Sequence, residues 1–164
     1  MNAKRTFYKV TGKTAEEIDA SMDRRGPPGR FHAVTHNDIS WKFWWHDSSR
    51  GCKIFMVGTT VEIEFVLPRL QNKAALPPKL KRDWDRFYAA LNRHEDKHAE
   101  YAVAGAREIE RKIVAMGSRN TCAQLEMDAN RIGKQVREKS RRLNKTYDRK
   151  TNHGMREGAV WPPK

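Results

Sequence analysis

Alternation of hydrophobic and polar residues marks three segments in the first half of the chain as strands. The alternation covers residues 6–10, 31–45 and 52–67, and a period of two is typical of strands that bury one face. The turn-forming run Ser48-Ser49-Arg50-Gly51 separates the last two segments and predicts a hairpin. Pro68 is expected to end the third strand. The pattern therefore predicts a small antiparallel sheet of about three strands.

Helical patterns occupy the rest of the chain. Thr14 and Glu17 form a capping box that opens a short helix, and Gly26 begins the Gly-Pro run that ends it. Hydrophobic residues then recur at helical spacing over residues 83–116 and, after a break at Gly117, from Thr121 to about residue 145. Residues 147–164 contain Gly and Pro and predict a loop. Together these elements predict an α+β fold in one domain of residues 1–164, with the small antiparallel sheet packed against two long antiparallel helices and a short N-terminal helix.

The chain is strongly basic. Lys and Arg number 33 against 20 Asp and Glu, which gives a net charge of +13, and many of these cations fall in residues 131–150. Such a field attracts polyanions without selecting among them, so we expect at most non-specific polyanion binding; the simpler interpretation is a solvated surface. No apolar run approaches the roughly 18 residues of a membrane span, and no apolar signal segment follows the first residues. We expect no membrane span, and the sequence indicates no oligomeric state.

The candidate chemistry lies on the first long helix, in the pattern His94-Glu95-Asp96-Lys97-His98. Four residues turn a helix by about 400°, so the imidazoles of His94 and His98 leave one face, a turn apart, and can reach one Zn²⁺ ion. Glu95 lies about 100° around the helix, where its carboxylate can take a proton from a zinc-bound water instead of binding the metal. A helix that carries two histidines by chance is the alternative, but it would have to accommodate both imidazoles on an apolar stripe.

A catalytic zinc needs a third protein ligand, and the sequence places it in the C-terminal segment. The metzincin continuation is excluded because the chain has Tyr101 and Ala104 where Gly and His are required, and residues 113–125 hold no carboxylate for the gluzincin arrangement. If the two long helices are antiparallel about Gly117, the second ends beside the histidine pair. We therefore expect His153 to be the third ligand, with Asp148 as the alternative; whichever does not bind the metal can orient a ligand.

These residues predict a zinc-dependent hydrolase, first of all a metallopeptidase. Tyr147 or Tyr101 could stabilise the oxyanion, and the spacing does not choose between them; Tyr147 is the tyrosine that we name as a catalytic candidate. Two other classes stay open: a basic binding module for anionic polymers with a structural metal, and a zinc amidase acting on cell-wall peptides. A catalytic zinc keeps an open coordination position, whereas a structural zinc has four protein ligands. Cys52 and Cys122 form either one disulfide or two buried thiols.

An ordered set of residues over nearly the whole chain resembles a bacterial family of formerly unknown function, described as predicted secreted zinc-dependent proteases. The residues that carry the resemblance are 8–14, 35–41, Gly51, Cys52, 67–69, Trp84, 91–98, Cys122, Tyr147, Asp148, Thr151, His153, Gly154, Gly158, Ala159, Trp161 and Pro162. The resemblance implies a zinc peptidase that acts on peptide or protein substrates and has a Cys52–Cys122 disulfide. It also implies a periplasmic or secreted location; because no signal segment is seen, a cytoplasmic location is the alternative.

Overall fold

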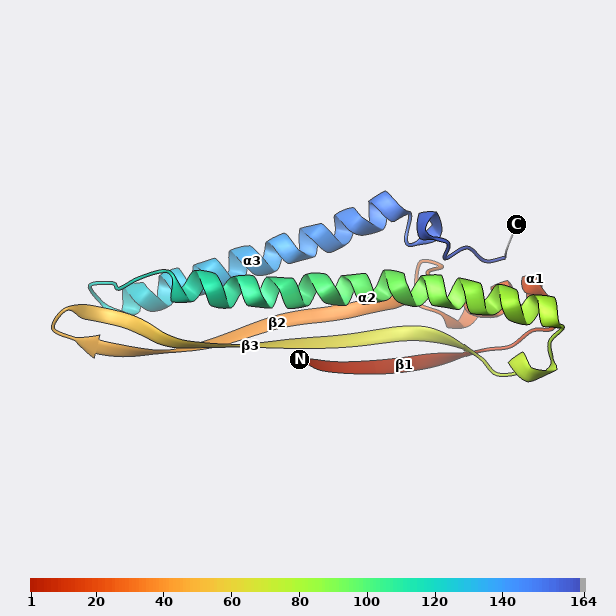
Figure 1. The fold of residues 1–164 in the computed structure, drawn as a ribbon, viewed down its shortest axis with the longest axis horizontal. Coiled ribbons are helices and arrows are strands. Elements are labelled where there is room, and N and C mark those ends of the chain that lie inside the picture. The colour runs from red at the N-terminus through yellow and green to blue at the C-terminus, as the bar shows by residue number, and fades with distance from the viewer. Residues whose placement is uncertain (163–164) are drawn as a thin grey trace. The chain divides into compact units, whose positions relative to one another are not determined.

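The computed structural model describes residues 1–162 and has an α+β fold with a three-stranded mixed sheet and three helices (Figure 1). In chain order the elements are β1 (Asn2–Val10), α1 (Ala15–Arg25), β2 (Val34–Ser48), β3 (Gly51–Leu70), the 3-10 turn η1 (Lys73–Ala75), α2 (Pro78–Val114), α3 (Cys122–Thr151) and the 3-10 turn η2 (Met155–Glu157). The predicted fold class is confirmed: a small sheet, a short N-terminal helix and two long helices.

The chain divides into two compact units, which we describe separately. Unit 1 consists of residues 1–2, 37–62 and 100–144, and unit 2 of residues 3–36, 63–99 and 145–164. Unit 1 therefore holds the turn between β2 and β3 and the turn between α2 and α3. Unit 2 holds β1, α1, the second half of β3, the first part of α2 and the C-terminal segment. The assignment of residues 1–164 to one domain stays a prediction.

The sheet has the strand order β1-β3-β2, so β1 pairs with β3 and not with the next strand along the chain. In unit 2 the Thr6 hydroxyl donates to Glu64 at 2.8 Å, and the Gln71 amide donates to the Val10 carbonyl at 2.9 Å. Contacts that advance in the same direction along both segments show that β1 is parallel to β3, as Figure 1 shows. The expectation of a wholly antiparallel sheet was therefore wrong for β1, because β1 pairs with β3 and not with β2, the strand that runs opposite to both.

Several element boundaries differ from the sequence prediction. β1, for example, begins at Asn2 instead of residue 6. β3 runs to Leu70 through Pro68. Because β3 has 20 residues and β2 only 15, the last part of β3 extends beyond β2, so the missing N–H of the proline breaks no bond to β2. α2 begins at Pro78, five residues before the predicted start, and proline suits the first turn of a helix. α3 continues to Thr151 instead of ending near residue 145.

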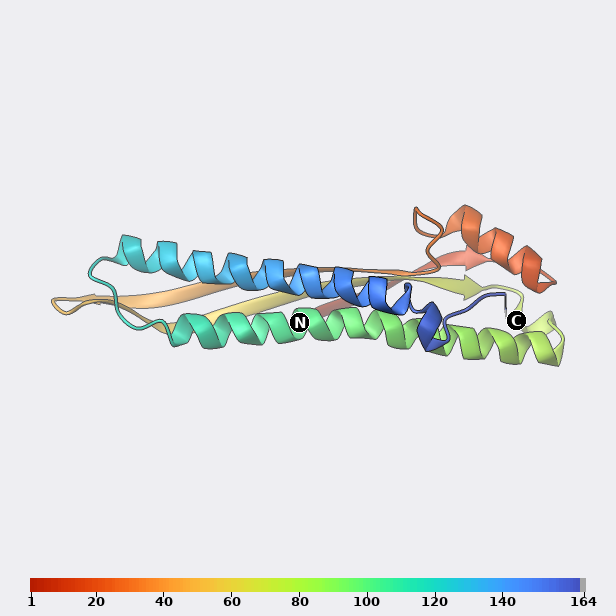
Figure 2. The same ribbon diagram turned by 90° about the horizontal axis from the view of Figure 1, so that it is seen from above.

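Unit 1 is built around the packing of α2 and α3 on the β2–β3 hairpin. The Ser140 hydroxyl donates to the Tyr101 carbonyl at 3.2 Å, and Lys139 donates to Glu108 at 2.9 Å. These contacts join the two helices, which run side by side in opposite directions here (Figures 1 and 2). A side chain at Gly133 would have its Cβ 2.2 Å from the Trp41 ring, so only glycine lets α3 approach this tryptophan.

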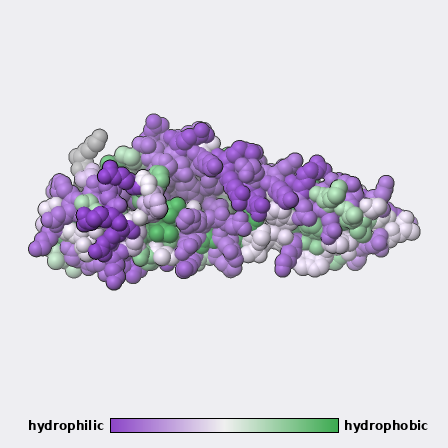
Figure 3. Space-filling view, turned by 180° about the vertical axis from the view of Figure 1, so that it is seen from behind, coloured by the Kyte–Doolittle hydropathy of each residue, from purple (hydrophilic) through white to green (hydrophobic). Residues whose placement is uncertain are grey.

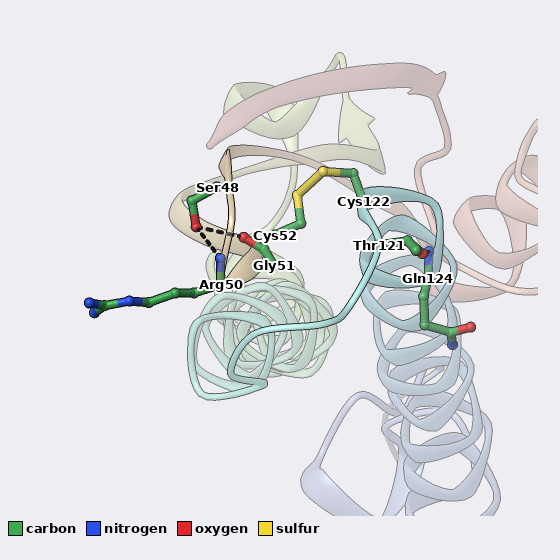
Figure 4. Close-up of a disulfide and its surroundings, with 7 residues drawn as sticks. All are labelled: Ser48, Arg50, Gly51, Cys52, Thr121, Cys122 and Gln124. Carbon is green, nitrogen blue, oxygen red and sulfur yellow. Dashed lines mark hydrogen bonds between the residues drawn. A yellow bond between two sulfur atoms is a disulfide. The ribbon is translucent and has the colours of Figure 1, made fainter.

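A disulfide between Cys52 and Cys122 joins the start of β3 to the start of α3, as Figure 4 shows. The Cα atoms are 5.1 Å apart, within the range of unstrained disulfides. Beside it, Cys52 and Arg119 exchange two backbone hydrogen bonds of 2.8 and 2.9 Å. The Arg119 and Arg131 guanidinium groups hold the pKa of Asp128 at about 2, so this carboxylate stays ionised and fixes the turn before α3. The sequence left open one disulfide or two buried thiols, and the disulfide is confirmed.

Unit 2 has an aromatic core beneath α2. Trp84 and Phe87 on α2 each lie 5.5 Å, between ring centroids, from Trp161 in the C-terminal segment. The Trp161 indole donates to the carbonyl of Ala15 at 3.0 Å. The segment after α3 is therefore anchored to both α2 and α1.

The surface of the described residues is mostly polar. The face in Figure 3 is covered largely by hydrophilic residues, with separate smaller hydrophobic areas. Among residues 1–162 no helix combines the length and apolar character that a membrane crossing needs.

We predict that Cys52→Ser/Cys122→Ser lowers the free energy of unfolding by about 4 kcal/mol, because the disulfide closes a loop of 70 residues in the unfolded chain. Urea denaturation of oxidised wild-type protein and of the variant measures the difference. As a control, thiols should be undetectable in unfolded, unreduced wild-type protein; two titrating thiols there would contradict the pairing.

Candidate metal centre

The HExxH residues lie on a buried face of α2 in unit 2. His94, Glu95 and His98 are 2, 4 and 6% exposed. The two imidazole rings approach edge to face with centroids 4.9 Å apart, and their Nε2 atoms are 3.3 Å apart. The predicted geometry of the i, i+4 pair is therefore present: both Nε2 atoms converge on one point.

Asp148 is the third group at this point. Its Oδ1 lies 3.2 Å from His94 Nε2 and 3.0 Å from His98 Nε2. The carboxylate reaches the pair because α3 continues for several residues beyond its predicted end, so Asp148 projects from a helix instead of a loop. No Gly or Pro interrupts residues 145–151; the helix ends only where Asn152, His153 and Gly154 take positive φ values of 50, 52 and 82°.

His153 lies next to this group but not within it. Its Nδ1 is 3.7 Å from Asp148 Oδ1, its side chain is 48% exposed, and its ring lies 4.5 Å from that of Phe31. Its amide donates to the Asp148 carbonyl at 2.9 Å as the helix closes. Asp148, the alternative in the sequence prediction, therefore lies against both imidazoles, and His153, the preferred residue, lies beside Asp148. Which of the two binds a metal stays a prediction.

The three donor atoms have the spacing that a zinc ion requires. Ligands at 2.0–2.1 Å from a tetrahedral zinc lie about 3.3 Å from one another. The separations here are 3.0, 3.2 and 3.3 Å. Two imidazoles and one carboxylate are also among the donor sets of catalytic zinc sites. The residues present therefore fit zinc without rearrangement.

Glu157 fixes the orientation of the first imidazole, and no pattern in the sequence pointed to this glutamate. Its Oε2 lies 2.9 Å from His94 Nδ1, so the Nδ1 proton is held by a carboxylate while Nε2 points to Asp148. The Tyr147 hydroxyl donates to both Glu157 oxygens at 2.9 and 2.8 Å, and its ring stacks on His94 with centroids 4.8 Å apart. Tyr147, predicted to stabilise an oxyanion, contacts the site here through this imidazole and this carboxylate.

Glu95 is held by the first residues of β2. The Thr35 hydroxyl donates to Glu95 Oε2 at 2.7 Å, which fixes the carboxylate on the side of the helix that faces β2. Thr35 stood in the predicted strand, but alternation alone could not show that its hydroxyl meets this glutamate. Tyr101, the other tyrosine considered for the oxyanion, belongs to unit 1.

The charges at the centre are set by burial and by mutual contact. Burial raises the pKa of Glu95, and the Thr35 hydrogen bond and the nearby imidazoles offset only part of this. Burial lowers the pKa of His94, but hydrogen bonds with Asp148 and Glu157 outweigh it and give a net rise. For Asp148 burial is again outweighed, and hydrogen bonds with the two imidazoles hold the pKa of its carboxyl well below the usual range. Asp148 is therefore ionised at neutral pH.

Two further groups in the described chain bring donor atoms within 4.8 Å: Asp19, Asp23 and His32, and Asp47, Cys52 and Cys122. In the second group the sulfur atoms are bonded to each other and cannot bind a metal. In the first, His32 Nε2 is 3.7 Å from Asp19 Oδ1, and Asp23 Oδ2 forms an ion pair with Arg30 Nε at 3.3 Å. Neither group matches the close spacing found at His94.

We predict that Gly154→Ala destabilises the protein by about 1–3 kcal/mol more than Gly117→Ala. Both glycines have positive φ, 82 and 75°, so each alanine carries a similar backbone cost. A Cβ at 154 would lie 3.0 Å from His94 Cγ, whereas a Cβ at 117 meets nothing within 4 Å. Urea denaturation of both variants measures the difference, and equal losses would show that Gly154 does not hold the His94 ring in place.

Comparison with known proteins identifies a family for the chain but no individual relative. The model of the family described as "Bacterial protein of unknown function (DUF922)" matches residues 5–154, a range that includes His94, Glu95, His98 and Asp148. No curated protein and no solved structure shows significant similarity to the chain. Because the match covers most of its length, the chain belongs to the DUF922 family of bacterial proteins.

Proposed function

We propose that the protein is a zinc-dependent hydrolase, and specifically a metallopeptidase, with zinc held by His94, His98 and Asp148. One observation carries the proposal: two buried imidazoles and a partly buried carboxylate at zinc spacing lie beside a buried glutamate in an HExxH helix. The contacts of Glu157, Tyr147 and Thr35 with these groups also support it. Metal-binding histidines commonly donate the N–H of their second ring nitrogen to a carboxylate, as His94 can to Glu157.

Each residue has a role in the proposed reaction. When bound, zinc supplies a Lewis acid that polarises a carbonyl group and lowers the pKa of water. Glu95 accepts the proton of the attacking water and passes it to the leaving amine. Its burial favours this role, because a raised carboxyl pKa makes it a better base. The Thr35 hydroxyl holds the Glu95 carboxylate in one orientation. Glu157 binds His94 Nδ1 and so leaves Nε2 of the same ring available to the metal.

A structural metal in a basic binding module is the second candidate, and His153 is the observation that favours it. A fourth protein ligand would close the site. His153 brings a further imidazole close to the group, with its Nδ1 3.7 Å from Asp148 Oδ1. We favour a catalytic metal because the His153 side chain is half exposed and lies against Phe31, outside the close contacts among His94, His98 and Asp148. The site then keeps one position open.

The Cys52–Cys122 disulfide supports a location outside the reducing cytoplasm, so we propose a periplasmic or secreted enzyme. In such a compartment peptides of the cell wall are available as well as proteins. A zinc amidase that acts on those peptides would need the same metal and base, and it differs from a peptidase only in substrate.

We predict that Asp148→Asn lowers zinc affinity at least 100-fold, as do His94→Ala and His98→Ala, because each change removes one of three ligands. His153→Ala should lower it less than tenfold. Isothermal titration calorimetry of the metal-free protein with zinc measures each affinity. Asp96→Asn is a matched control, since this carboxylate lies on the same helix but is half exposed and pairs with Arg5. If His153→Ala strips the metal and Asp148→Asn retains it, the ligand set proposed here is wrong.

We predict that Glu95→Gln retains zinc affinity within a few-fold and loses about 10²–10⁴-fold in hydrolysis, because the amide cannot accept a proton. Release of labelled peptides from unfolded casein by zinc-loaded protein is the measurement, with Asp96→Asn as the control of unchanged activity. Cleavage of cell-wall peptides but not of casein would identify an amidase. Zinc-loaded wild-type protein that cleaves neither substrate would favour the structural-metal candidate.

A further inference from the structure

Large hydrophobic side chains are exposed at the end of the β2–β3 hairpin in unit 1. Trp44, Trp45, Phe55 and Met56 are 43, 36, 54 and 46% exposed. They are four of the ten exposed large hydrophobic residues among residues 1–162, and they fall within 13 positions of the sequence. Monomeric proteins rarely gather such residues without an interaction to explain them.

The aromatic side chains contact one another on the hairpin itself. His46 stacks on Phe55 with centroids 4.2 Å apart, and the rings of Phe43 and Trp45 are 5.8 Å apart. The Trp44 ring passes over Gly58, where a Cβ would lie 3.6 Å from it. Because successive residues of a strand face opposite sides, these side chains present aromatic rings on both faces of the hairpin, and together we call them its aromatic surface.

The hairpin that carries this surface is firmly held at its turn. Ser48 accepts a hydrogen bond from the Arg50 amide at 3.2 Å and donates to the Gly51 carbonyl at 3.1 Å, and both bonds are visible in Figure 4. The next residue, Cys52, is fixed by the disulfide and by its two backbone bonds with Arg119. An anchored hairpin presents its aromatic residues in the free protein and loses little entropy on binding.

Cations surround the aromatic surface. Lys42, Arg50 and Lys53 are exposed, and Asp47 is the single acidic residue in the range 42–56. None of these three cations takes part in an ion pair with another described residue. Their charges are therefore available to an anionic partner.

We propose that the hairpin of residues 42–56 binds the surface of a membrane rich in anionic phospholipid. Trp favours the boundary between head groups and acyl chains, where its apolar ring and its polar N–H are both accommodated. Phe beside it adds a wholly apolar ring, as in other segments that lie at this boundary. Lys and Arg beside them attract anionic head groups, at about 1 kcal/mol for each cation near the surface. A soluble polyanion without rings or apolar groups, such as polyphosphate, would use the cations but leave the Trp, Phe and Met side chains in water. The aromatic surface and the flanking charge together thus favour a lipid surface, which unit 1 would touch without spanning it.

Binding to lipid vesicles tests the proposal with the full-length, oxidised protein. We expect sedimentation with vesicles of phosphatidylglycerol and phosphatidylcholine, much weaker sedimentation with phosphatidylcholine alone, and a blue shift of tryptophan fluorescence on binding. Trp44→Ser/Phe55→Ser should lower the affinity for the anionic vesicles at least tenfold, and Lys42→Gln/Lys53→Gln should lower it while leaving the weak phosphatidylcholine binding unchanged. Phe31→Ser/Leu143→Ser is the matched control, because these residues are 38 and 43% exposed elsewhere on the chain.

Urea denaturation and thiol titration of each variant establish that fold and disulfide are intact. Unchanged vesicle binding by Trp44→Ser/Phe55→Ser would overturn the proposal and assign the binding to net charge alone. A wild-type dimer that this variant cannot form, with no vesicle binding, would also overturn it and identify the hairpin as an interface between two copies. Neither result bears on zinc affinity or hydrolysis, which depend on residues of unit 2.

Discussion

Burial of two imidazoles and a carboxylate on one helix is the constraint on which unit 2 depends. His94, Glu95 and His98 lie almost fully out of water, and a buried polar group without a partner costs about 1–3 kcal/mol. Each therefore needs a polar group from elsewhere in the chain. Asp148 from the end of α3 contacts both imidazoles, and Thr35 from the start of β2 contacts Glu95. Segments far apart in sequence must converge on α2 for this helix face to be stable at all.

The C-terminal segment satisfies part of this constraint because it is fixed at both ends. At one end α3 closes through positive-φ residues, and Gly154 lies so close to His94 that a larger residue would displace the ring. At the other, Trp161 packs on Trp84 and donates to α1. Glu157 lies between these points, which places its carboxylate against His94 Nδ1 with little freedom to move. The position of one imidazole thus depends on an aromatic core that has no chemical role.

The HExxH face could be predicted because helix geometry alone determines it: residues four apart share a face whatever surrounds them. The third group could be predicted only to within a segment. Residues 147–154 contain both Asp148 and His153, and the choice between them depends on whether α3 ends before or after Asp148. The Gly and Pro residues from Gly154 onward led us to predict a loop over the whole of residues 147–164. Nothing in residues 145–151 breaks a helix, however, and α3 continues to Thr151. Glu157 and the parallel pairing of β1 had no local signal, because alternation shows which face of a strand is buried and not which strand lies beside it.

The order of the site residues along the chain has a consequence for biosynthesis. The helix with His94, Glu95 and His98 leaves the ribosome well before Asp148 and Glu157, so a nascent chain carries the motif without the carboxylates that orient and complete it. Two imidazoles alone bind zinc poorly compared with three ligands. Activity of the proposed kind would therefore begin only when the last part of α3 and the segment after it have been made and folded back, and a chain cut ahead of Asp148 would be inert from the start.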